Sequence, residues 1–210
     1  MEFREVSASY ENGGDAPTLN GVSLQMPPGA KVVICGRSGS GKSSLLLCLL
    51  RLLEVQQVSI TIDGCDIAIL DPVNLRARIG TVPHAPFFMP GSVRQNVYLR
   101  NVCSDCEVIR ILQKVSLSGS DPVSKWPHRG TQERGLVNGM DTATETLVQR
   151  LLETECQGCT VLAVMHRLHN IEWYDLVALV DGGIVVELDA PAALLGRDSQ
   201  FAKLYHAQAV

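Results

Sequence analysis

A glycine-rich segment constrains this chain more than any other feature. Residues 36–43 read GRSGSGKS and satisfy the pattern G-x-x-x-x-G-K-[ST]. The segment directly follows a short β-branched run, Lys31 to Cys35, and opens a stretch with leucines at helical spacing, Ser43 to Leu53. Strand, loop and helix in this order form the context in which the pattern folds as a phosphate-binding P-loop. The sequence therefore predicts an α/β fold that binds a triphosphate.

The residue types in this loop match the chemistry of a phosphate site. Glycines let the backbone wrap an anion so that successive N–H groups point inward, and the following helix adds partial positive charge. Lys42 is expected to reach the β- and γ-phosphates, and the Ser43 hydroxyl is expected to bind Mg²⁺. A glycine-rich turn that only resembles a P-loop is the alternative, and a P-loop alone does not separate transport ATPases from GTPases or small-molecule kinases.

The rest of the chain alternates between short apolar runs and amphipathic segments. This alternation predicts a largely parallel sheet with helices on its faces. Besides Lys31 to Cys35, strands are expected at Ser59 to Ile62, Ile79 to Val82, Thr160 to Met165, Leu176 to Val180 and Ile184 to Leu188. Further helices are expected at Glu107 to Val115 and Thr142 to Glu153. Residues 116–140 carry several glycines and prolines and fit neither pattern.

Length and composition limit the classes of protein. With 210 residues, the expectation is a single domain over 1–210 with an irregular, shortened segment at 116–140. A net charge of −4 argues against nucleic acid as a partner. No apolar stretch approaches the roughly 20 residues that cross a bilayer, and the N-terminus does not resemble a signal peptide. A cytoplasmic location is therefore expected, and in that reducing compartment an odd count of seven cysteines favours free thiols. Two Cys-x-x-Cys pairs, at 103–106 and 156–159, are widely separated, which disfavours a zinc site.

Several flanking motifs together resemble the ATP-binding domain of ABC transporters. The run VSASY ends at Tyr10, and the segments LNGVSL and PPGAK then lead into the P-loop strand. IDG at 62–64, LRARIG at 75–80 and GSVRQN at 91–96 follow in the family's order. Asp141 begins a segment similar to the family's D-loop, and His166 ends a strand similar to its His-switch strand. The best resemblance is to the second ATP-binding domain of C-subfamily, multidrug-resistance-type exporters.

This resemblance implies a set of functional residues. Tyr10 would stack on adenine, and His166 would act catalytically by sensing the γ-phosphate. Ser43 would hold Mg²⁺. The residues expected to bind ATP are Tyr10, Gly36, Arg37, Ser38, Gly39, Ser40, Gly41, Lys42, Ser43, Ser44, His84 and Asp141. The domains of this family work in pairs, so the resemblance implies a second ATP-binding domain and transmembrane domains as partners. It also implies a peripheral position on the cytoplasmic face of a membrane.

The chain departs from the family pattern at two places. His84 stands where the family has a glutamine. This change would weaken coupling to the membrane domain or make coupling sensitive to pH, because histidine titrates near pH 6.5; the alternative is a surface histidine without a role. Between Leu117 and Met140 the family has its signature motif, a helix and a strand ending in Asp-Glu, and no such strand is recognisable here. The fold is therefore expected to be an ABC-type ATP-binding domain, mostly parallel in its core sheet and truncated in the helical and signature region.

These departures leave several functions open. The first is an ATP-binding domain of an exporter that binds MgATP, with weak or no hydrolysis by itself. The second is a non-hydrolytic ATP-binding module with a regulatory role. The third is an incomplete product that has lost roughly 40 residues, a length judged from typical domain size. A small-molecule kinase remains possible from the P-loop alone, although the order of Tyr10, P-loop, Asp141 and His166 argues against it.

Overall fold

The structure is a computed structural model that describes residues 1–10, 17–82, 153–165 and 170–208, together with a few isolated positions between 90 and 168. The chain divides into two compact units. The first combines Met1–Gly80 with Gln157–Val210, and the second is Thr81–Cys156. Because residues 116–140 lie outside the described residues, the expectation of one domain with an irregular segment there stays a prediction.

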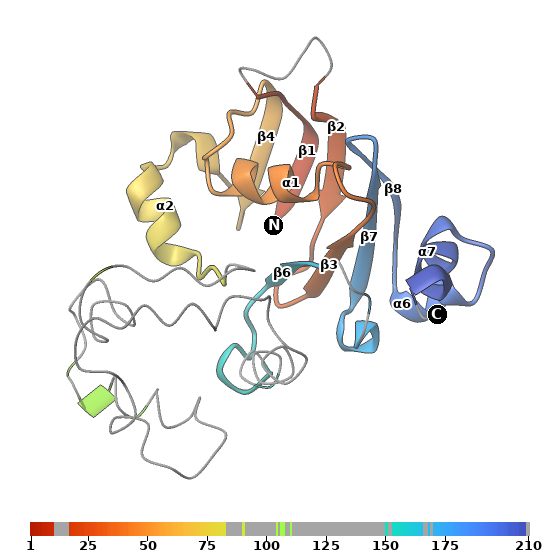
Figure 1. The fold of residues 1–210 in the computed structure, drawn as a ribbon. Helices are drawn as coiled ribbons and strands as arrows, with labels where there is room; N and C mark the ends of the chain where they lie inside the picture. The colour runs from red at the N-terminus through yellow and green to blue at the C-terminus, as the bar shows by residue number, and fades with distance from the viewer. Residues whose placement is uncertain are drawn as a thin grey trace. The chain divides into compact units, whose positions relative to one another are not determined.

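A four-stranded sheet in the first unit carries the glycine-rich loop (Figure 1). Its order is β6-β3-β7-β8, with β3 parallel to both β6 and β7, and β8 antiparallel to β7. The strand bounds are β3 (Lys31–Cys35), β6 (Val161–Val164), β7 (Leu176–Asp181) and β8 (Ile184–Asp189). Each lies within two residues of its predicted range. The mostly parallel core sheet is therefore confirmed.

Strand β6 is less buried than its apolar sequence suggested. All four of its residues are only half-buried, although Thr160 to Met165 reads as a strand buried on both faces. In the part of the chain that the structure describes, β6 pairs with β3 alone. A strand with a neighbour on one side keeps more of its surface accessible than a central strand does.

A second sheet, antiparallel and largely unforeseen from the sequence, covers one side of the first unit. Its order is β2-β1-β4-β5. The strands are β1 (Glu2–Ala8), β2 (Leu19–Gln25), β4 (Gln57–Ile62) and β5 (Cys65–Asp66). Strand β1 lacks a clean alternation of polar and apolar residues because a bulge interrupts its pairing, with Glu5 at a φ of 45°. Only β4 corresponds to a predicted strand.

Helix α1 (Lys42–Leu49) is shorter than the predicted Ser43 to Leu53. It ends because Arg51 adopts a left-handed φ of 52°, and the N–H groups of Leu52 and Leu53 turn back to the carbonyl of Leu47. After η1 (Ile67–Ile69) comes α2 (Pro72–Arg78), which the sequence analysis missed.

Local capping explains α2. Asp71 accepts a hydrogen bond from the N–H of Asn74 at 2.9 Å, and Pro72 occupies the first helical position, where its missing N–H costs nothing. The strand predicted at Ile79 to Val82 is wrong, because Ile79 is the C-cap of α2 and no strand follows it through Val82. Most of the two helices predicted at Glu107 to Val115 and Thr142 to Glu153 lies outside the described residues.

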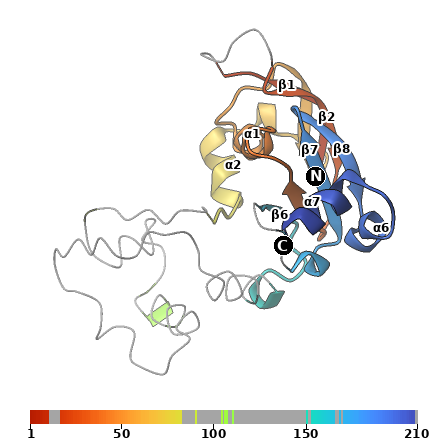
Figure 2. The same cartoon turned by 45° about the vertical axis from the view of Figure 1, so that its right-hand side comes forward.

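The parallel sheet has a core on each face. Val32 and Ile34 face the antiparallel sheet and Leu45 of α1, whereas Val33 and Cys35 face the C-terminal helices. The C-terminal layer consists of η2 (Ile171–Trp173), α6 (Pro191–Leu195) and α7 (Gln200–Gln208). Figure 2 shows α6 and α7 beside β7 and β8, away from α1. This packing on both faces fixes the carboxyl end of β3, where the glycine-rich loop begins.

Candidate nucleotide-binding site

Two glycines in the loop cannot be replaced without displacing backbone. Gly36 has a φ of 147°, and a Cβ there would lie 2.0 Å from the carbonyl oxygen of Val180. Gly41, the N-cap of α1, has a φ of 102°, and a Cβ there would meet Thr18 O at 3.1 Å. Both positions combine a left-handed φ with close approach of another strand or turn. The loop conformation therefore requires glycine at its two ends.

The Lys42 ammonium lies inside the loop. Its Nζ donates hydrogen bonds to the carbonyl oxygens of Gly36, at 2.9 Å, and Arg37, at 2.7 Å. Lys42 is only 3% exposed, and this burial lowers the pKa of its ammonium. A cation that the loop backbone holds in this way is suited to an anionic ligand.

The first turn of α1 adds further groups for an anion. No Asp or Glu lies in that turn to offset the positive end of the helix. The first N–H groups of a helix have no acceptor within the helix. In α1 the Leu45 N–H donates to the carbonyl of the N-cap residue, Gly41. Ser43 is exposed, so its hydroxyl is accessible to a metal ion, whereas Ser44 is buried.

Tyr10 and Ser44 are brought together although they are 34 residues apart. The Tyr10 Oη and the Ser44 Oγ lie 3.1 Å from each other, within hydrogen-bond distance. Tyr10 follows β1 and is 43% exposed, which leaves part of its ring accessible beside the loop. An aromatic residue therefore stands next to the helix end that would hold phosphates.

The turn between β7 and β8 contacts the loop and supports it, a contact that was not predicted from the sequence. The Gly183 N–H donates to Ser40 O at 3.1 Å, and the Asn20 N–H donates to Gly183 O at 2.9 Å. The Ser40 hydroxyl is buried without a hydrogen-bond partner among the described residues. The Gly182-Gly183 pair was the available signal, because both adopt a positive φ and a Cβ at Gly183 would lie 2.5 Å from Thr18 O.

The structure thus brings together Tyr10 and the residues of the loop, with Arg37, Ser38 and Gly39 exposed at its tip. Three other predicted site residues, His84, Asp141 and His166, lie outside the described residues. Cys103 of the first Cys-x-x-Cys pair lies there too. In the described part of the chain, no cluster of three or more His, Cys, Asp or Glu side chains could hold a metal ion.

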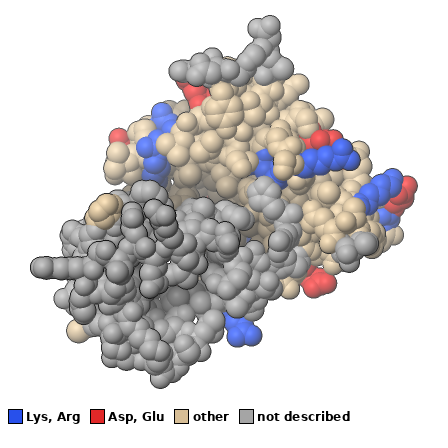
Figure 3. All heavy atoms as spheres, viewed as in Figure 1, with Lys and Arg blue, Asp and Glu red and all other residues tan. Residues whose placement is uncertain are grey.

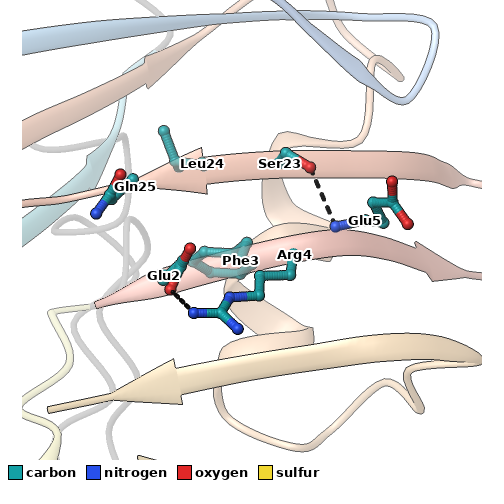
Figure 4. A pocket seen from close by; sticks show the side chains of 7 residues that line it. All are labelled: Glu2, Phe3, Arg4, Glu5, Ser23, Leu24 and Gln25. Atoms are coloured by element: carbon teal, nitrogen blue, oxygen red, sulfur yellow. Dashed lines mark hydrogen bonds and ion pairs between the residues drawn. The ribbon is translucent and has the colours of Figure 1, made fainter. Parts of the chain in front are cut away.

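A shallow hollow of about 520 Å³ lies on the surface of β1 and β2 (Figure 4). It is lined by Glu2, Phe3, Arg4, Glu5, Ser23, Leu24 and Gln25. Arg4 forms an ion pair with Glu2 at 2.7 Å, which satisfies both charges and lowers the pKa of Glu2. Because the hollow is open and none of its residues belongs to the loop, its size does not make it the functional site.

Charge is scattered over the one face of the described residues that the space-filling view draws. On the face that Figure 3 shows, the Lys and Arg side chains of the described residues are separated by neutral surface and by acidic side chains. The ion pairs Arg197–Asp189, at 3.1 Å, and Lys203–Asp198, at 3.0 Å, are examples of such mixed charge. On that face the described residues form no broad basic patch, so an anion near the loop would be bound by the buried Lys42 and the helix end.

Comparison with known proteins identifies the family. The family model described as ABC transporter matches residues 19–146. The chain is 36% identical over 230 positions to the ABC transporter ecdL of Aspergillus rugulosus, which covers 97% of this chain and 16% of the relative. It is 34% identical to ABC transporter C family member 5 of Arabidopsis thaliana, covering 97% of this chain and 15% of that protein. It is 31% identical to ATP-binding cassette sub-family C member 3 of Rattus norvegicus, and that match covers 96% of this chain and 15% of the relative.

A solved structure gives the same fold. The chain is similar, with a TM-score of 0.84 and 24% identity, to a bacterial Atm1-family ABC exporter with ATP bound, and the match covers 100% of this chain and 42% of that one. The chain spans about a sixth of the length of the curated relatives. Among the described residues no helix has the length and hydropathy needed to cross a membrane. From the matching family model and the shared fold, the chain belongs to the ABC transporter family, with that family's P-loop nucleotide-binding fold.

Proposed function

We propose that this chain binds MgATP at the loop formed by residues 36–44 and serves as the ATP-binding domain of a membrane exporter. The observation that carries the proposal is the buried Lys42 ammonium, which two loop carbonyls hold at the uncompensated N-terminus of α1. When bound, Mg²⁺ would neutralise part of the charge on the β- and γ-phosphates. The exposed Ser43 hydroxyl is the group of this chain that would bind the ion.

The remaining site residues take roles suggested by their place in the family's motif order. Tyr10, half-exposed beside the loop, would stack on the adenine ring. His166 would contact the γ-phosphate and act in catalysis, and His84 and Asp141 would contact the nucleotide or its water. These three assignments rest on sequence alone.

The partners follow from the size of the relatives. Proteins that match this chain over nearly its whole length are about six times longer, and several are named as members of ABC subfamily C. We infer that the chain, as one ATP-binding domain over 1–210, works with a second ATP-binding domain and with transmembrane domains. It would then lie at the cytoplasmic face of a membrane.

Hydrolysis by this chain alone is expected to be weak or absent. The alignment with ecdL runs over 230 positions and the whole chain has 210 residues, so at least 20 positions of that relative have no counterpart here. This difference supports a chain that is shorter than the corresponding part of ecdL, and the sequence pattern alone points to the signature segment and catalytic strand between Leu117 and Met140 as the shortened part. A carboxylate that polarises the attacking water contributes about 10²- to 10⁴-fold in rate, and its loss leaves binding without turnover. A non-hydrolytic regulatory module and an incomplete product are the alternatives that share this property.

ATP binding and turnover by the purified chain with Mg²⁺ test the proposal. Lys42→Ala is the control, since it removes the ammonium inside the loop. We expect MgATP binding that falls at least tenfold in Lys42→Ala, with no turnover above that of the variant. Absence of binding by the unaltered chain would contradict the ATP-binding function, and Lys42-dependent turnover would contradict the shortened catalytic segment. Phosphate transfer to an added small-molecule acceptor would instead favour a kinase.

A further inference from the structure

We propose that the Tyr10 hydroxyl is a positioning group for the Ser44 hydroxyl, so that Tyr10 contributes to binding the phosphates as well as the base. This inference rests on the proposed function, because it concerns the same site. It starts from the 3.1 Å contact between Tyr10 Oη and Ser44 Oγ. A ring that only stacks on a base has no need of its hydroxyl, whereas a hydroxyl bonded to the first turn of α1 acts on the phosphate side.

Ser44 is placed so that the orientation of its hydroxyl matters. The residue is 5% exposed and lies in the first turn of α1, two residues after Lys42. A serine hydroxyl carries a single donor hydrogen and rotates to suit its partners. When Tyr10 Oη donates to Ser44 Oγ, the serine hydrogen stays available to donate to a phosphate oxygen. The two hydroxyls then form a chain in which each hydrogen bond strengthens the next.

Backbone contacts hold the segment that precedes Tyr10 close to the loop. Tyr10 comes two residues after Ala8, the end of β1, and the Thr18 N–H donates to Ala8 O at 2.9 Å. The Thr18 carbonyl in turn lies against Gly41, where a Cβ would meet it at 3.1 Å. The segment that carries Tyr10 is therefore fixed to the N-cap of α1 through Thr18. This support holds the backbone before Tyr10 close to the first turn of α1, where Ser44 lies.

The proposal predicts an effect on a ligand that has no base. Inorganic tripolyphosphate with Mg²⁺ offers phosphates without adenine, so a stacking role of Tyr10 cannot affect its affinity. We expect Tyr10→Phe to weaken the binding of Mg-tripolyphosphate by about fivefold, the change typical of one neutral hydrogen bond. The affinity for MgATP should fall by a similar factor, because Phe retains the aromatic ring that would stack on adenine.

The experiment is a double-mutant cycle by calorimetric titration on the full chain. The proteins are the unaltered chain, Tyr10→Phe, Ser44→Ala and the double variant, each titrated with Mg-tripolyphosphate and with MgATP. The double variant should bind no more weakly than Ser44→Ala, since the hydroxyl of Tyr10 acts only through Ser44. Ser44→Thr, which restores a hydroxyl, should recover most of the tripolyphosphate affinity and should again respond to Tyr10→Phe.

The outcomes separate this inference from the function on which it rests. If the unaltered chain binds neither ligand, the ATP-binding function fails and this inference fails with it. If the chain binds MgATP but Tyr10→Phe leaves tripolyphosphate affinity unchanged, the function stands and the positioning role is wrong. Independent effects of the two substitutions, which multiply in the double variant, would also overturn it.

Discussion

At the residue scale, burial sets the chemistry of two cysteines in the core. Cys35, at the end of β3, and Cys48, in α1, are both buried with no exposed surface. Burial raises the pKa of the Cys35 thiol from 9.0 to about 12, and it raises that of Cys48 from 9.0 to about 11. The thiolate is the reactive form of cysteine, so both side chains are expected to be inert packing groups at neutral pH.

These raised pKa values predict a loss of stability in alkaline solution. Below pH 9 both thiols are protonated in the folded and unfolded chain, and their contribution is fully present. Between pH 9 and about 11 to 12 the unfolded chain loses protons that the folded chain retains, so the free energy of unfolding falls as pH rises. Urea unfolding at pH 8 and at pH 10.5 measures this fall, and Cys48→Ala should reduce it. An identical pH dependence in Cys48→Ala would contradict the assignment.

Two glycines of the loop differ in why they are needed. At Gly36 an added Cβ would lie 2.0 Å from Val180 O, whereas at Gly39, with a φ of 79°, it would meet nothing within 4 Å. We expect Gly36→Ala to cost about 3 kcal/mol or more, because strand β7 must move as well as the loop backbone. Gly39→Ala should cost only about 1 kcal/mol, the strain of a left-handed alanine. Chemical denaturation measures both, and equal losses would argue against the close approach at Gly36.

At the element scale, the end of α1 depends on an arginine from α2. The Arg76 guanidinium donates to Leu50 O at 2.8 Å and to Arg51 O at 2.7 Å, where α1 ends. Arg51 donates to the carbonyls of Ile67 and Leu70 in the segment before α2. The bonds from Arg76 satisfy carbonyls at the end of α1 that have no intrahelical donor, and the bonds from both arginines tie the two helices together.

Removal of this cap should destabilise the first unit. We expect Arg76→Ala to lower the free energy of unfolding by about 2 kcal/mol, because it leaves two partly buried carbonyls without their donor. Arg78→Ala is a matched control on the same helix, and Arg78 is exposed, so its change should stay within about 0.5 kcal/mol. Urea denaturation measures the free energy of unfolding of both variants. Equal losses in Arg76→Ala and Arg78→Ala would show that the capping contacts contribute little.

At the scale of the whole molecule, the ligand site joins parts of the chain that are far apart in sequence. The loop follows β3, the turn after β7 donates a hydrogen bond to it, and Tyr10 lies just after β1 in the other sheet. The two sheets share one hydrophobic core, which includes Phe3, Val6, Val32, Ile34, Leu45 and Val180. A ligand that contacts the loop and Tyr10 would therefore stabilise both sheets at once.

This arrangement predicts that MgATP raises the melting temperature. At a free concentration about 100 times its Kd, a ligand that binds only the folded state adds roughly 2.7 kcal/mol, which corresponds to about 5 to 10 °C for a chain of this size. Differential scanning calorimetry measures this shift, and Lys42→Ala should show little of it at the same concentration. A shift of equal size in Lys42→Ala would mean that the stabilising site is elsewhere.

The sequence by itself determined the central features of the site. The strand at Lys31–Cys35, the loop and a helix that starts within one residue of the predicted Ser43 follow from local pattern, because turn glycines and β-branched runs act over a few residues. The alternation of strands and helices also predicted a largely parallel sheet, although not which strands pair. The order of motifs along the chain was also sufficient to indicate the family.

Only the tertiary structure decided the rest. The bulged β1 and the supports at Gly183 and Tyr10 depend on contacts between residues that are distant in the sequence. Local propensity does not encode the donor that Arg76 supplies to α1, nor the close approach of Val180 to Gly36. Such contacts form only when the core brings the two sheets together, and for that reason the residues that position the loop could not be read from the loop's own sequence.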